Sequence, residues 1–529
     1  MHVKKYFNIT GPCNRERHYM VNINKRLQET KALVDNGDYF VINRARQYGK
    51  TTILKNLKTF LSEEYFVFSI SFEGFTDDVF QSENVFCQRV FKLLYTSMIY
   101  GNSGMIPEAI VEECRDMFTA KKNDVDLWTL SDFISRLCQQ LAKPAVLLVD
   151  EVDQASNQQI FLAFLGTLRD QYINQSDRPA FQSVVLAGVY DIKNLKLRIR
   201  SEQEHQYNSP WNIAAKFDID MSFTPDDIRG MLEEYAADRE LSFDYDAVSG
   251  LIYDYTCGYP FLVSAICKNI DEQILPLHPE YAWGQEGIME SIHLLLKYPN
   301  TLFDDMIKHL TEYPDLANIL QNILFEGQEY PFNAYAKVFN VGIMFGFLKD
   351  SHGQVAVSNK IFETHLYNYF LAEEIASNSA ERMAVSDRNQ FIEHGHLNMR
   401  MVMDKFVQYY SDIYSNSDNI FVEKYGRKIF LLYLKTIING TGNFYIEAQI
   451  RDLTRTDVII DYAGEQFIIE LKIWRGETYQ KQGEQQLFQY LELYHKNTGY
   501  LLTFNFNKHK ETGMREIIFK DKILLEYMV

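Results

Sequence analysis

Short apolar segments alternate with longer amphipathic stretches through the N-terminal third of the chain. An uninterrupted apolar segment predicts a strand that is buried on both faces, as in a parallel sheet. Strands that alternate with long helices predict a parallel α/β sheet. The predicted strands are 39–42, 65–72, 144–149 and 183–189, and the predicted helices are 22–34, 51–61, 83–100 and 125–141.

A helical region and a small hairpin follow this pattern. Thr224 and Pro225 predict a helix start, with the threonine as N-cap and the proline at the first helical position. The segment 256–262 contains a glycine and a proline and predicts a turn before another helix. The apolar segment 338–348 and the strand-like segment 354–357 flank a polar turn and predict a winged helix. We expect it to pack against the helical region, because the basic recognition helix of a DNA reader is missing.

A β-hairpin is predicted near the C-terminus, around the two-residue turn Ala463-Gly464. In the register that this turn sets, Asp457 lies directly opposite Glu470, with Cβ atoms roughly 5 Å apart. Lys472, two residues further on, shares the face of Glu470. The two strands of this hairpin are predicted at 457–461 and 466–473.

A motif typical of nucleotide binding follows the first predicted strand. Gly49-Lys50-Thr51 comes after a short loop and opens a helix. In such an arrangement backbone N–H groups hold the phosphates, the lysine reaches the β and γ oxygens, and the threonine hydroxyl binds Mg²⁺. Arg44 stands where the standard loop has its first glycine, and the alternative interpretation is a turn with an incidental Gly-Lys-Thr. The residues expected to bind ATP are Arg46, Gln47, Tyr48, Gly49, Lys50, Thr51 and Thr52.

The predicted strand 144–149 runs into a carboxylate pair. Asp150 would lie beside the Gly-Lys-Thr loop, where the Mg²⁺ of the nucleotide needs an oxygen ligand. Thr51 would supply a second ligand to this ion. Glu151 would polarise the attacking water. A buried strand that ends in an Asp-Glu turn also occurs without function, but here the pair and the loop stand in one chain in the expected order. We interpret this part as a nucleotide-binding P-loop domain.

The end of the fourth predicted strand is where related ATPases carry a polar sensor of the γ-phosphate. A nearby arginine can serve as a finger that stabilises charge in the transition state. Surface arginines are more often solvated than catalytic, which is the alternative for these positions. The candidates are Tyr190, Asp191, Arg198 and Arg200.

The predicted C-terminal hairpin carries a candidate metal site. Two carboxylates and a lysine on one face of a strand pair are costly in a core and suited to catalysis with a metal ion. We expect Asp457, Glu470 and the carbonyl of Leu471 to bind Mg²⁺. Lys472 would orient a water molecule and help to deprotonate it.

The alternative for this hairpin is a solvated, salt-bridged surface. Ile459, Ile469 and Ile473 are expected on the face of the carboxylates, which argues for burial. The helix that follows adds two polar residues four positions apart, hence on one helical face. These residues are Gln486 and Tyr490, and the acidic residues Glu423 and Glu447 lie upstream.

Composition and charge limit the partners. A length of 529 residues predicts three or four domains. The net charge of −18 argues against loose electrostatic binding to nucleic acid. The charge is uneven, because 386–529 holds 18 basic and 19 acidic residues and almost all of the acidic excess lies in 1–385. The six cysteines form no C-x-x-C pair, which favours reduced thiols in a cytoplasm. No apolar run approaches the ~18 residues that span a bilayer, and the first residues lack the apolar core of a signal peptide. These features predict a cytoplasmic protein without a membrane partner.

The segment 374–390 is small and polar, and we predict a linker there. Together with the patterns above it divides the chain into four predicted domains. These are a P-loop AAA-like ATPase core at 1–220, a helical lid at 221–300, a winged-helix-like region at 301–385 and a mixed-sheet domain at 386–529.

Asp457, Glu470-x-Lys472 and Gln486-x-x-x-Tyr490 resemble the PD-(D/E)XK nuclease fold, of the RecB-like kind. The turn at 256–262 resembles the G-x-P turn that opens a lid helix in AAA+ and STAND ATPases. Taken whole, the chain resembles the bacterial family that joins an AAA-ATPase-like domain to a C-terminal PD-(D/E)XK domain. This resemblance is strongest at 36–56, 144–153 and 420–495.

The resemblance implies an α/β chain with a P-loop ATPase domain, ATP and Mg²⁺ as cofactors, and an ATP-dependent or ATP-gated nuclease. Its partner would be nucleic acid, with DNA favoured over RNA, and a homo-oligomer stays open. The alternative is a STAND-like signalling or defence switch whose nuclease-like domain only binds. Two departures from the family pattern are Arg44 and Thr456, the latter where the motif has proline. The implied catalytic residues are Asp457, Glu470, Lys472, Gln486, Tyr490 and, in the ATPase domain, Glu151.

Overall fold

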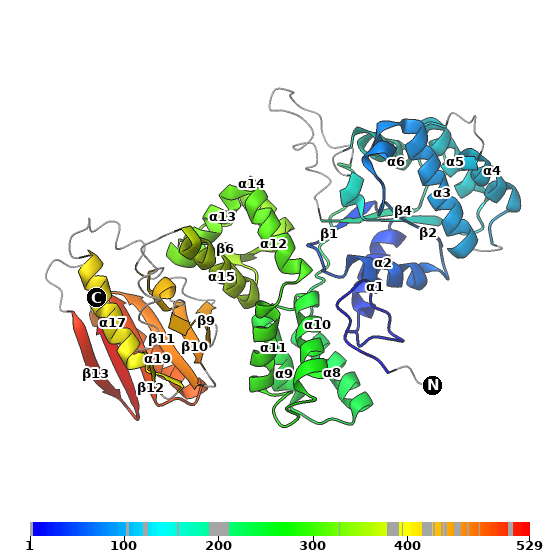
Figure 1. Cartoon of the computed structure of the whole chain (residues 1–529). Helices are drawn as coiled ribbons and strands as arrows, with labels where there is room; N and C mark the ends of the chain where they lie inside the picture. The colour runs from blue at the N-terminus through cyan, green and yellow to red at the C-terminus, as the bar shows by residue number, and fades with distance from the viewer. Residues whose placement is uncertain are drawn as a thin grey trace. The chain divides into compact units, whose positions relative to one another are not determined.

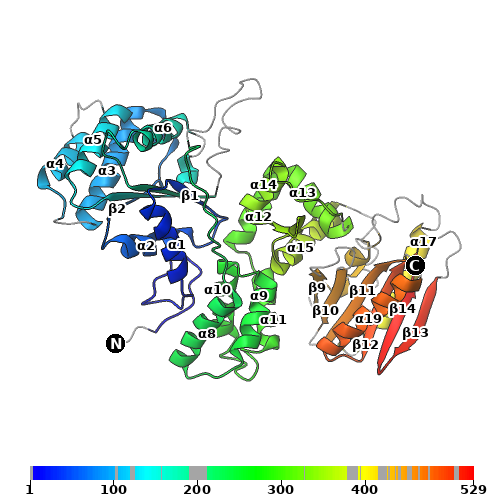
Figure 2. The same ribbon diagram turned by 180° about the vertical axis from the view of Figure 1, so that it is seen from behind.

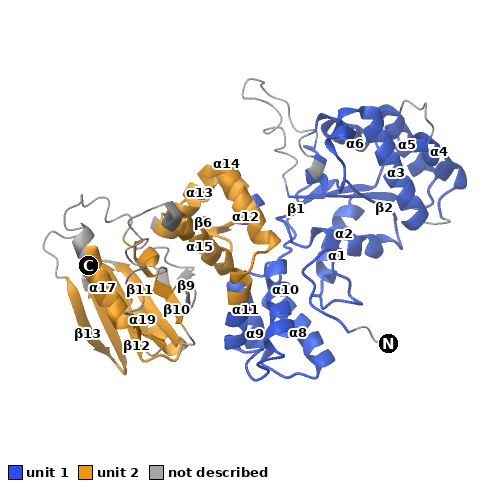
Figure 3. Cartoon of the chain, in the orientation of Figure 1, with its two compact units in different colours: residues 1–291, 344–346 blue, residues 292–343, 347–529 orange. Residues whose placement is uncertain are grey.

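The chain forms two compact units in a computed structural model (Figure 3). Unit 1 comprises 1–291 with 344–346, and unit 2 comprises 292–343 with 347–529. This division is coarser than the four predicted domains, whose boundaries remain predictions. The residues that the structure describes are 4–101, 105–119, 125–155, 158–189, 211–326, 328–377, 391–393, 395–414, 426, 429–434, 437–438, 442–448, 456–462, 465–474, 477–505 and 512–529.

A four-stranded parallel sheet in the order β1-β4-β3-β2 forms the centre of unit 1. A single parallel bridge between Phe40 and Ala215 adds a short element on the free side of β1. The parallel α/β sheet that the sequence predicts is confirmed. The elements are α1 (Asn24–Asp35), β1 (Phe40–Asn43), α2 (Lys50–Leu61), β2 (Phe66–Ser71), η1 (Asp77–Gln81), α3 (Glu83–Gly101), α4 (Glu108–Thr119), α5 (Leu127–Gln140), β3 (Ala145–Asp150), η2 (Val152–Ala155), α6 (Gln159–Ile173) and β4 (Ser183–Gly188).

Both faces of this sheet are buried, because its strands are apolar at nearly every position. Helices α3 to α6 cover one face, and α1 and α2 cover the other (Figures 1 and 2). Phe68 and Leu147 belong to the core on the first face, where they meet phenylalanines of α3, α5 and α6. Val146 and Leu148 belong to the core on the second face, with leucines of α1 and α2. Burial on both sides fixes the carboxyl ends of the strands, where the candidate nucleotide site lies.

A helical bundle completes unit 1. Thr224 caps the first of its helices, as predicted: its hydroxyl accepts the N–H of Asp227 at 3.1 Å, and the Asp227 carboxylate accepts the N–H of Thr224 at 3.0 Å. Pro225 occupies the first helical position. These reciprocal bonds form a capping box, which satisfies two N–H groups that a helix start leaves open. The helices are α8 (Pro225–Arg239), α9 (Tyr245–Thr256), α10 (Pro260–Asn269), η4 (Ile270–Ile274) and α11 (Gln285–Lys297), of which α11 extends into unit 2.

Gly258 joins α9 to α10 in a conformation that other residues rarely adopt. Its φ is +71°, and a Cβ atom there would lie 1.9 Å from the carbonyl oxygen of Phe223. The N–H of Phe223 donates to the carbonyl of Gly258 at 2.8 Å, so that the turn is fastened directly to the segment that leads into α8. The turn predicted at 256–262 therefore requires glycine for two reasons, backbone conformation and space.

We expect Gly258→Ala to destabilise unit 1 by about 3 kcal/mol or more, since it combines a left-handed alanine with a backbone clash. The free energy of unfolding can be measured with urea. Gly250→Ala is the matched control, because Gly250 lies within α9 and a Cβ there meets no atom within 4 Å. The control should be neutral or stabilising by up to about 1 kcal/mol. Equal stability of the two variants would contradict the packing described here.

The N-terminal part of unit 2 contains helices and the predicted hairpin. Strands β5 and β6 pair antiparallel, with Leu348 opposite Val357. Helix α15 extends to Ser377, so the first residues of the predicted linker are helical, and its remainder lies outside the described residues. None of the helices in the described part of the chain combines the length and apolar character needed to cross a bilayer. The elements are α12 (Thr301–Glu312), α13 (Pro314–Gln321), η5 (Asn322–Glu326), α14 (Lys337–Met344), β5 (Leu348–Ser351), β6 (Gln354–Val357) and α15 (Lys360–Ser377).

A mixed six-stranded sheet in the order β13-β14-β12-β11-β10-β9 forms the C-terminal part of unit 2. Helices α17 and α19 lie on its opposite faces (Figures 1 and 2). Strands β11, β12 and β14 run parallel to their neighbours in the centre, and antiparallel pairs stand on both sides. The elements are β7 (Ile392–Glu393), β8 (His396–Leu397), α17 (Met399–Tyr414), β9 (Gly442–Ala448), β10 (Thr456–Tyr462), β11 (Glu465–Ile473), α19 (Glu477–Leu493), β12 (Thr498–Phe504), β13 (Gly513–Phe519) and β14 (Lys522–Met528).

The register of the predicted hairpin is confirmed, with Asp457 opposite Glu470. One expectation about its faces is wrong. Positions 469 and 473 of β11 are odd, whereas Glu470 is at an even position, so the alternation of the strand assigns them to the other face of the sheet. Ile468 is the isoleucine of β11 on the Glu470 face, where it packs in the core under α19.

Candidate functional site

The loop between β1 and α2 has the geometry of an anion site. Gln47 and Gly49 have positive φ angles of 56° and 80°, which turn the backbone back on itself before the helix begins at Lys50. Thr51 lies in the first turn of α2. Free backbone N–H groups at a helix start, inside such a turn, favour bound phosphate.

Lys50 points back into this loop. Its ammonium group donates to the carbonyls of Arg44 and Ala45, both at 2.9 Å. Burial lowers the pKa of Lys50, while the carboxylates of Asp153 and Glu151 act to raise it. The lysine therefore lies within electrostatic reach of the acidic turn that follows β3, as the two sequence motifs predict.

Arg44, which occupies the position of the first loop glycine, has partners on a distant segment. Its guanidinium donates to the carbonyl of Ile219 at 2.8 Å and to that of Asn43 at 2.9 Å. It also lies over the ring of Phe217, 5.3 Å from the centroid. The side chain is held by the chain beside β1, which explains how a large residue is accommodated where the standard loop has none.

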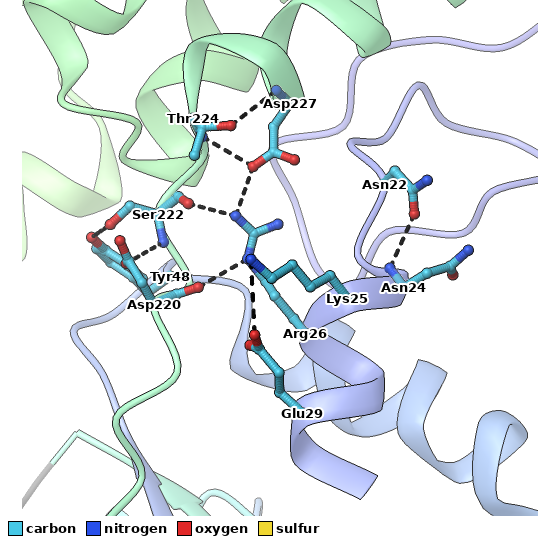
Figure 4. A network of polar contacts seen from close by, with 10 residues as sticks. All are labelled: Asn22, Asn24, Lys25, Arg26, Glu29, Tyr48, Asp220, Ser222, Thr224 and Asp227. Atoms are coloured by element: carbon cyan, nitrogen blue, oxygen red, sulfur yellow. Dashed lines mark hydrogen bonds and ion pairs between the residues drawn. The ribbon is translucent and has the colours of Figure 1, made fainter. Parts of the chain in front are cut away.

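Two tyrosines join the loop to the helical bundle. The hydroxyl of Tyr48 lies 2.7 Å from that of Ser222 (Figure 4), and the hydroxyl of Tyr259 donates to the carbonyl of Arg46 at 2.5 Å. The two rings meet edge to face, with centroids 4.7 Å apart. The side chain of Arg46 is exposed. The loop is thus bonded on both sides of Gln47, through the Arg46 carbonyl to the N-cap residue of α10 and through the Tyr48 side chain to the segment before α8.

The N-terminal segment and α1 also contact this region. The hydroxyl of Thr52 accepts the N–H of Cys13 at 3.1 Å, so Thr52 faces the N-terminal segment. Arg26 of α1 donates to the carbonyl of Ser222 and to the carboxylate of Asp227, both at 2.7 Å (Figure 4). A polar cavity of about 600 Å³ lies beside this network.

The acidic turn after β3 is strained and partly buried. Glu151 has a φ of 54°, uncommon for a residue other than glycine, and strain of this kind gathers at functional sites. The Asp150 carboxylate accepts the N–H of Glu151 at 2.9 Å. Burial raises the pKa of Glu151, and the neighbouring Asp150 raises it further. A carboxyl with a raised pKa is a better proton acceptor near neutral pH.

Asp153 is a residue of this turn that the sequence reasoning missed. Both of its carboxylate oxygens accept the N–H of Val189, at 2.8 and 2.7 Å. Gly188 leaves room for it, since a Cβ there would lie 2.8 Å from the Asp153 carboxylate. Asp153 therefore connects the ends of β3 and β4. The candidate sensor and finger residues Tyr190, Asp191, Arg198 and Arg200 lie outside the described residues.

A second candidate site lies on β10 and β11. The backbone register aligns Glu447, Asp457 and Glu470 in one row across β9, β10 and β11. Glu470 is completely buried and Lys472 is 2% exposed, which excludes the solvated hairpin for these two residues. Leu471 is opposite Thr456. Glu423 lies outside the described residues.

Helix α19 covers this site. Gln486 and Tyr490 are 6% and 8% exposed, and Tyr490 packs in the apolar core with Ile468. Among the side chains that the structure describes, no group of three His, Cys, Asp or Glu residues is assembled to hold a metal ion. The predicted ligands therefore depend on Asp457, which the register brings beside Glu470.

A buried polar network fastens α19 to the sheet next to Lys472. Gln480 donates to the Glu526 carboxylate and, at 3.3 Å, to the hydroxyl of Thr503, which pairs with Lys472 in the sheet. Arg515 forms an ion pair with Glu526. Burial raises the pKa of Glu526, and Arg515 opposes this shift. Gln480 lies six residues before Gln486, about 120° away around the helix, so helical spacing gave no signal for it.

The fold and these two sites define a P-loop ATPase-type domain followed by a nuclease-type domain. The sequence matches the family model of the AAA-like domain over residues 13–370, and the chain belongs to this family. Residues 441–517 match the PD-(D/E)XK nuclease superfamily. Both assignments agree with the resemblance drawn from the sequence.

Several solved structures are similar to the chain at low sequence identity. The Walker-type ATPase of Pyrococcus abyssi is 11% identical, with 68% of this chain and 99% of that chain covered and a TM-score of 0.46. The ORC2 protein of Aeropyrum pernix is 14% identical, with coverages of 70% and 97% and a TM-score of 0.37. RuvB of Thermotoga maritima is 13% identical, with coverages of 67% and 97% and a TM-score of 0.32. A comparison with curated proteins finds no significant match.

Proposed function

We propose that the chain is a nuclease whose C-terminal active site hydrolyses phosphodiester bonds, with DNA as the favoured substrate, under the control of an ATP-binding N-terminal domain. The observation that carries this proposal is the withdrawal of Glu470 and Lys472 from solvent beside the register position of Asp457. Charged side chains are costly to bury, and buried titratable groups gather at functional sites.

The candidate site fits a divalent cation. Glu447, Asp457 and Glu470 occupy one row of backbone positions across the sheet. Acidic residues at neighbouring positions of a sheet repel one another, and a divalent cation relieves this repulsion. Asp457, Glu470 and the carbonyl of Leu471 would hold Mg²⁺, which supplies a polarised phosphate and an activated water. Lys472 would orient that water and help to deprotonate it. Gln486 and Tyr490 would orient the substrate.

The ATP site is proposed on the loop before α2. Lys50 would contact the β- and γ-phosphates, and Thr51 and Asp150 would hold Mg²⁺. Glu151 would accept a proton from the attacking water, in agreement with its raised pKa. The bonds from Tyr48 and Tyr259 would transmit the state of the loop to the helical bundle. The six cysteines, all within the described residues, are not joined in disulfides, which suits a reducing compartment such as the cytoplasm.

A second candidate function is a nucleotide-dependent switch in which the nuclease-like domain only binds nucleic acid. Arg44 favours it, because the side chain fastens the loop to Ile219 and Phe217 and so limits its movement. Such a protein would bind ATP tightly and hydrolyse it slowly. The acidic excess in 1–385 also favours protein contacts over DNA contacts for that part.

Lys50→Ala should abolish the rise in melting temperature that ATP produces, because the mutant loses the cation that contacts the phosphates. Differential scanning fluorimetry with and without ATP and Mg²⁺ measures this rise. Lys55→Ala, at an exposed position of the same helix, is the matched control and should keep it. A normal ATP-dependent shift in Lys50→Ala would rule out the assignment of this loop.

Glu151→Gln should keep ATP binding and lower the rate of phosphate release by roughly 10²-fold or more, since the amide cannot accept the proton of the water. Phosphate release is measured under single-turnover conditions. Glu63→Gln, which changes an exposed glutamate, is the control. If the wild-type protein binds ATP and releases no phosphate with any substrate, the switch is the better interpretation.

Asp457→Ala and Glu470→Ala should weaken Mn²⁺ binding and remove cleavage together. Lys472→Ala should keep Mn²⁺ binding and lower the cleavage rate by roughly 10²-fold, because it removes a positioned electrostatic group but no ligand. Gln486→Ala should cost less. Calorimetry measures the metal affinity, and cleavage is assayed with plasmid, linear DNA and RNA as substrates.

Gln485→Ala, on the exposed side of α19, is the control for these nuclease variants. Glu470→Gln keeps the shape of the side chain and separates loss of the charge from loss of folding. All of these variants should keep the ATP-dependent thermal shift. Wild-type cleavage by Asp457→Ala would mean that this site is not the nuclease centre, and would leave the binding module as the function of the C-terminal domain.

A further inference from the structure

Helix α19 passes unusually close to Lys472. The residue of the helix above the lysine is Gly483, and a Cβ atom there would lie 2.3 Å from the Lys472 Nζ, 2.9 Å from its Cδ and 3.1 Å from its Cε. Contacts below 3.0 Å are not tolerated, because atoms overlap at that distance. The ammonium group of Lys472 thus occupies the volume that any other residue at position 483 would fill.

The helix cannot simply move away to make room. One turn before Gly483, Gln480 is bonded to Glu526 and Thr503 in the buried network. One turn after it, Leu487 contacts β12 so closely that a Cβ on Gly499 would lie 2.9 Å from the leucine. Polar bonds on one side and tight apolar packing on the other therefore hold α19 at a fixed height above β11.

We propose that Gly483 is a positioning residue of the nuclease site, which sets the location of the Lys472 ammonium group. The proposal rests on the nuclease function proposed above. Glycine is required at 483 because it is the one residue whose side chain leaves the lysine its place under α19. The residue acts through Lys472 and touches neither metal nor substrate.

A methyl group at position 483 would displace the lysine and leave the fold intact. The three atoms that it would meet are the far end of a long, flexible side chain, whose rotamers can change at small cost. Alanine also favours the helix over glycine. Gly483→Ala should therefore yield a folded protein in which the ammonium group lies elsewhere.

The test compares full-length wild type, Gly483→Ala, Lys472→Ala and the double variant. Gly483→Ala should lower kcat for cleavage of linear DNA by roughly 10- to 100-fold, the scale of a displaced catalytic group. KM and the affinity for Mn²⁺ should change by less than about twofold, because no ligand or substrate contact is removed. Gly166→Ala is the matched control, since Gly166 lies within α6 and a Cβ there meets no atom within 4 Å; it should cleave like wild type.

The double variant distinguishes positioning from a general structural role. When Lys472 is alanine, the space above it is free, so adding Gly483→Ala should change kcat by less than about twofold. Gly483→Ala should raise the melting temperature more in the Lys472→Ala background than in the wild-type background. In the Lys472→Ala background the higher helix propensity of alanine is not offset by a clash with the lysine.

The outcomes separate this inference from the proposed function. A wild-type protein that cleaves no substrate would overturn the nuclease proposal, and the melting temperatures would still report whether 483 and 472 are coupled. Cleavage by Gly483→Ala at the wild-type rate would overturn the positioning role. An equal loss of rate in both backgrounds, or equal shifts in melting temperature, would do the same.

Discussion

The C-terminal domain is organised by the burial of two charged side chains, Glu470 and Lys472, between one strand and one helix. A buried charge without partners costs several kcal/mol, so the surrounding structure must supply them. The row of acidic positions on β9 to β11 and the polar network from Gln480 to Glu526 lie on the two sides of this pair. The leucines of α19 close the remaining surface. Helix α19, the order of the strands and their register together keep these two charged side chains out of contact with solvent.

Local rules explain what could be predicted from the sequence. A two-residue turn and the strict alternation of strand side chains fix the register that brings Asp457 opposite Glu470, and the structure has this register. The same alternation contradicts the expected places of Ile469 and Ile473, because their positions in β11 are odd and that of Glu470 is even. The loop before Lys50 is likewise a local pattern, since its strand, turn and helix are contiguous in the chain.

The residues that the sequence did not reveal depend on distances between segments far apart in the chain. Asp153 becomes notable only because β4 brings Val189 to its carboxylate. Gly483 is one of many glycines until α19 is laid over Lys472. Arg44 is recognisable in the sequence as a departure from a motif, but its partner Ile219 lies 175 residues further along the chain. Sequence patterns find chemical groups, and only packing shows which neighbours constrain them.

Asp227 performs two tasks with one carboxylate, and this has a consequence for cooperativity. It completes the cap of α8 by accepting the N–H of Thr224, and it receives the guanidinium of Arg26 from α1. A cap of this kind contributes about 1 kcal/mol to helix stability. Separation of α1 from the bundle would reduce the order of that carboxylate and so loosen the first turn of α8. Docking of α1 and formation of the first turn of α8 are therefore thermodynamically linked through this one carboxylate.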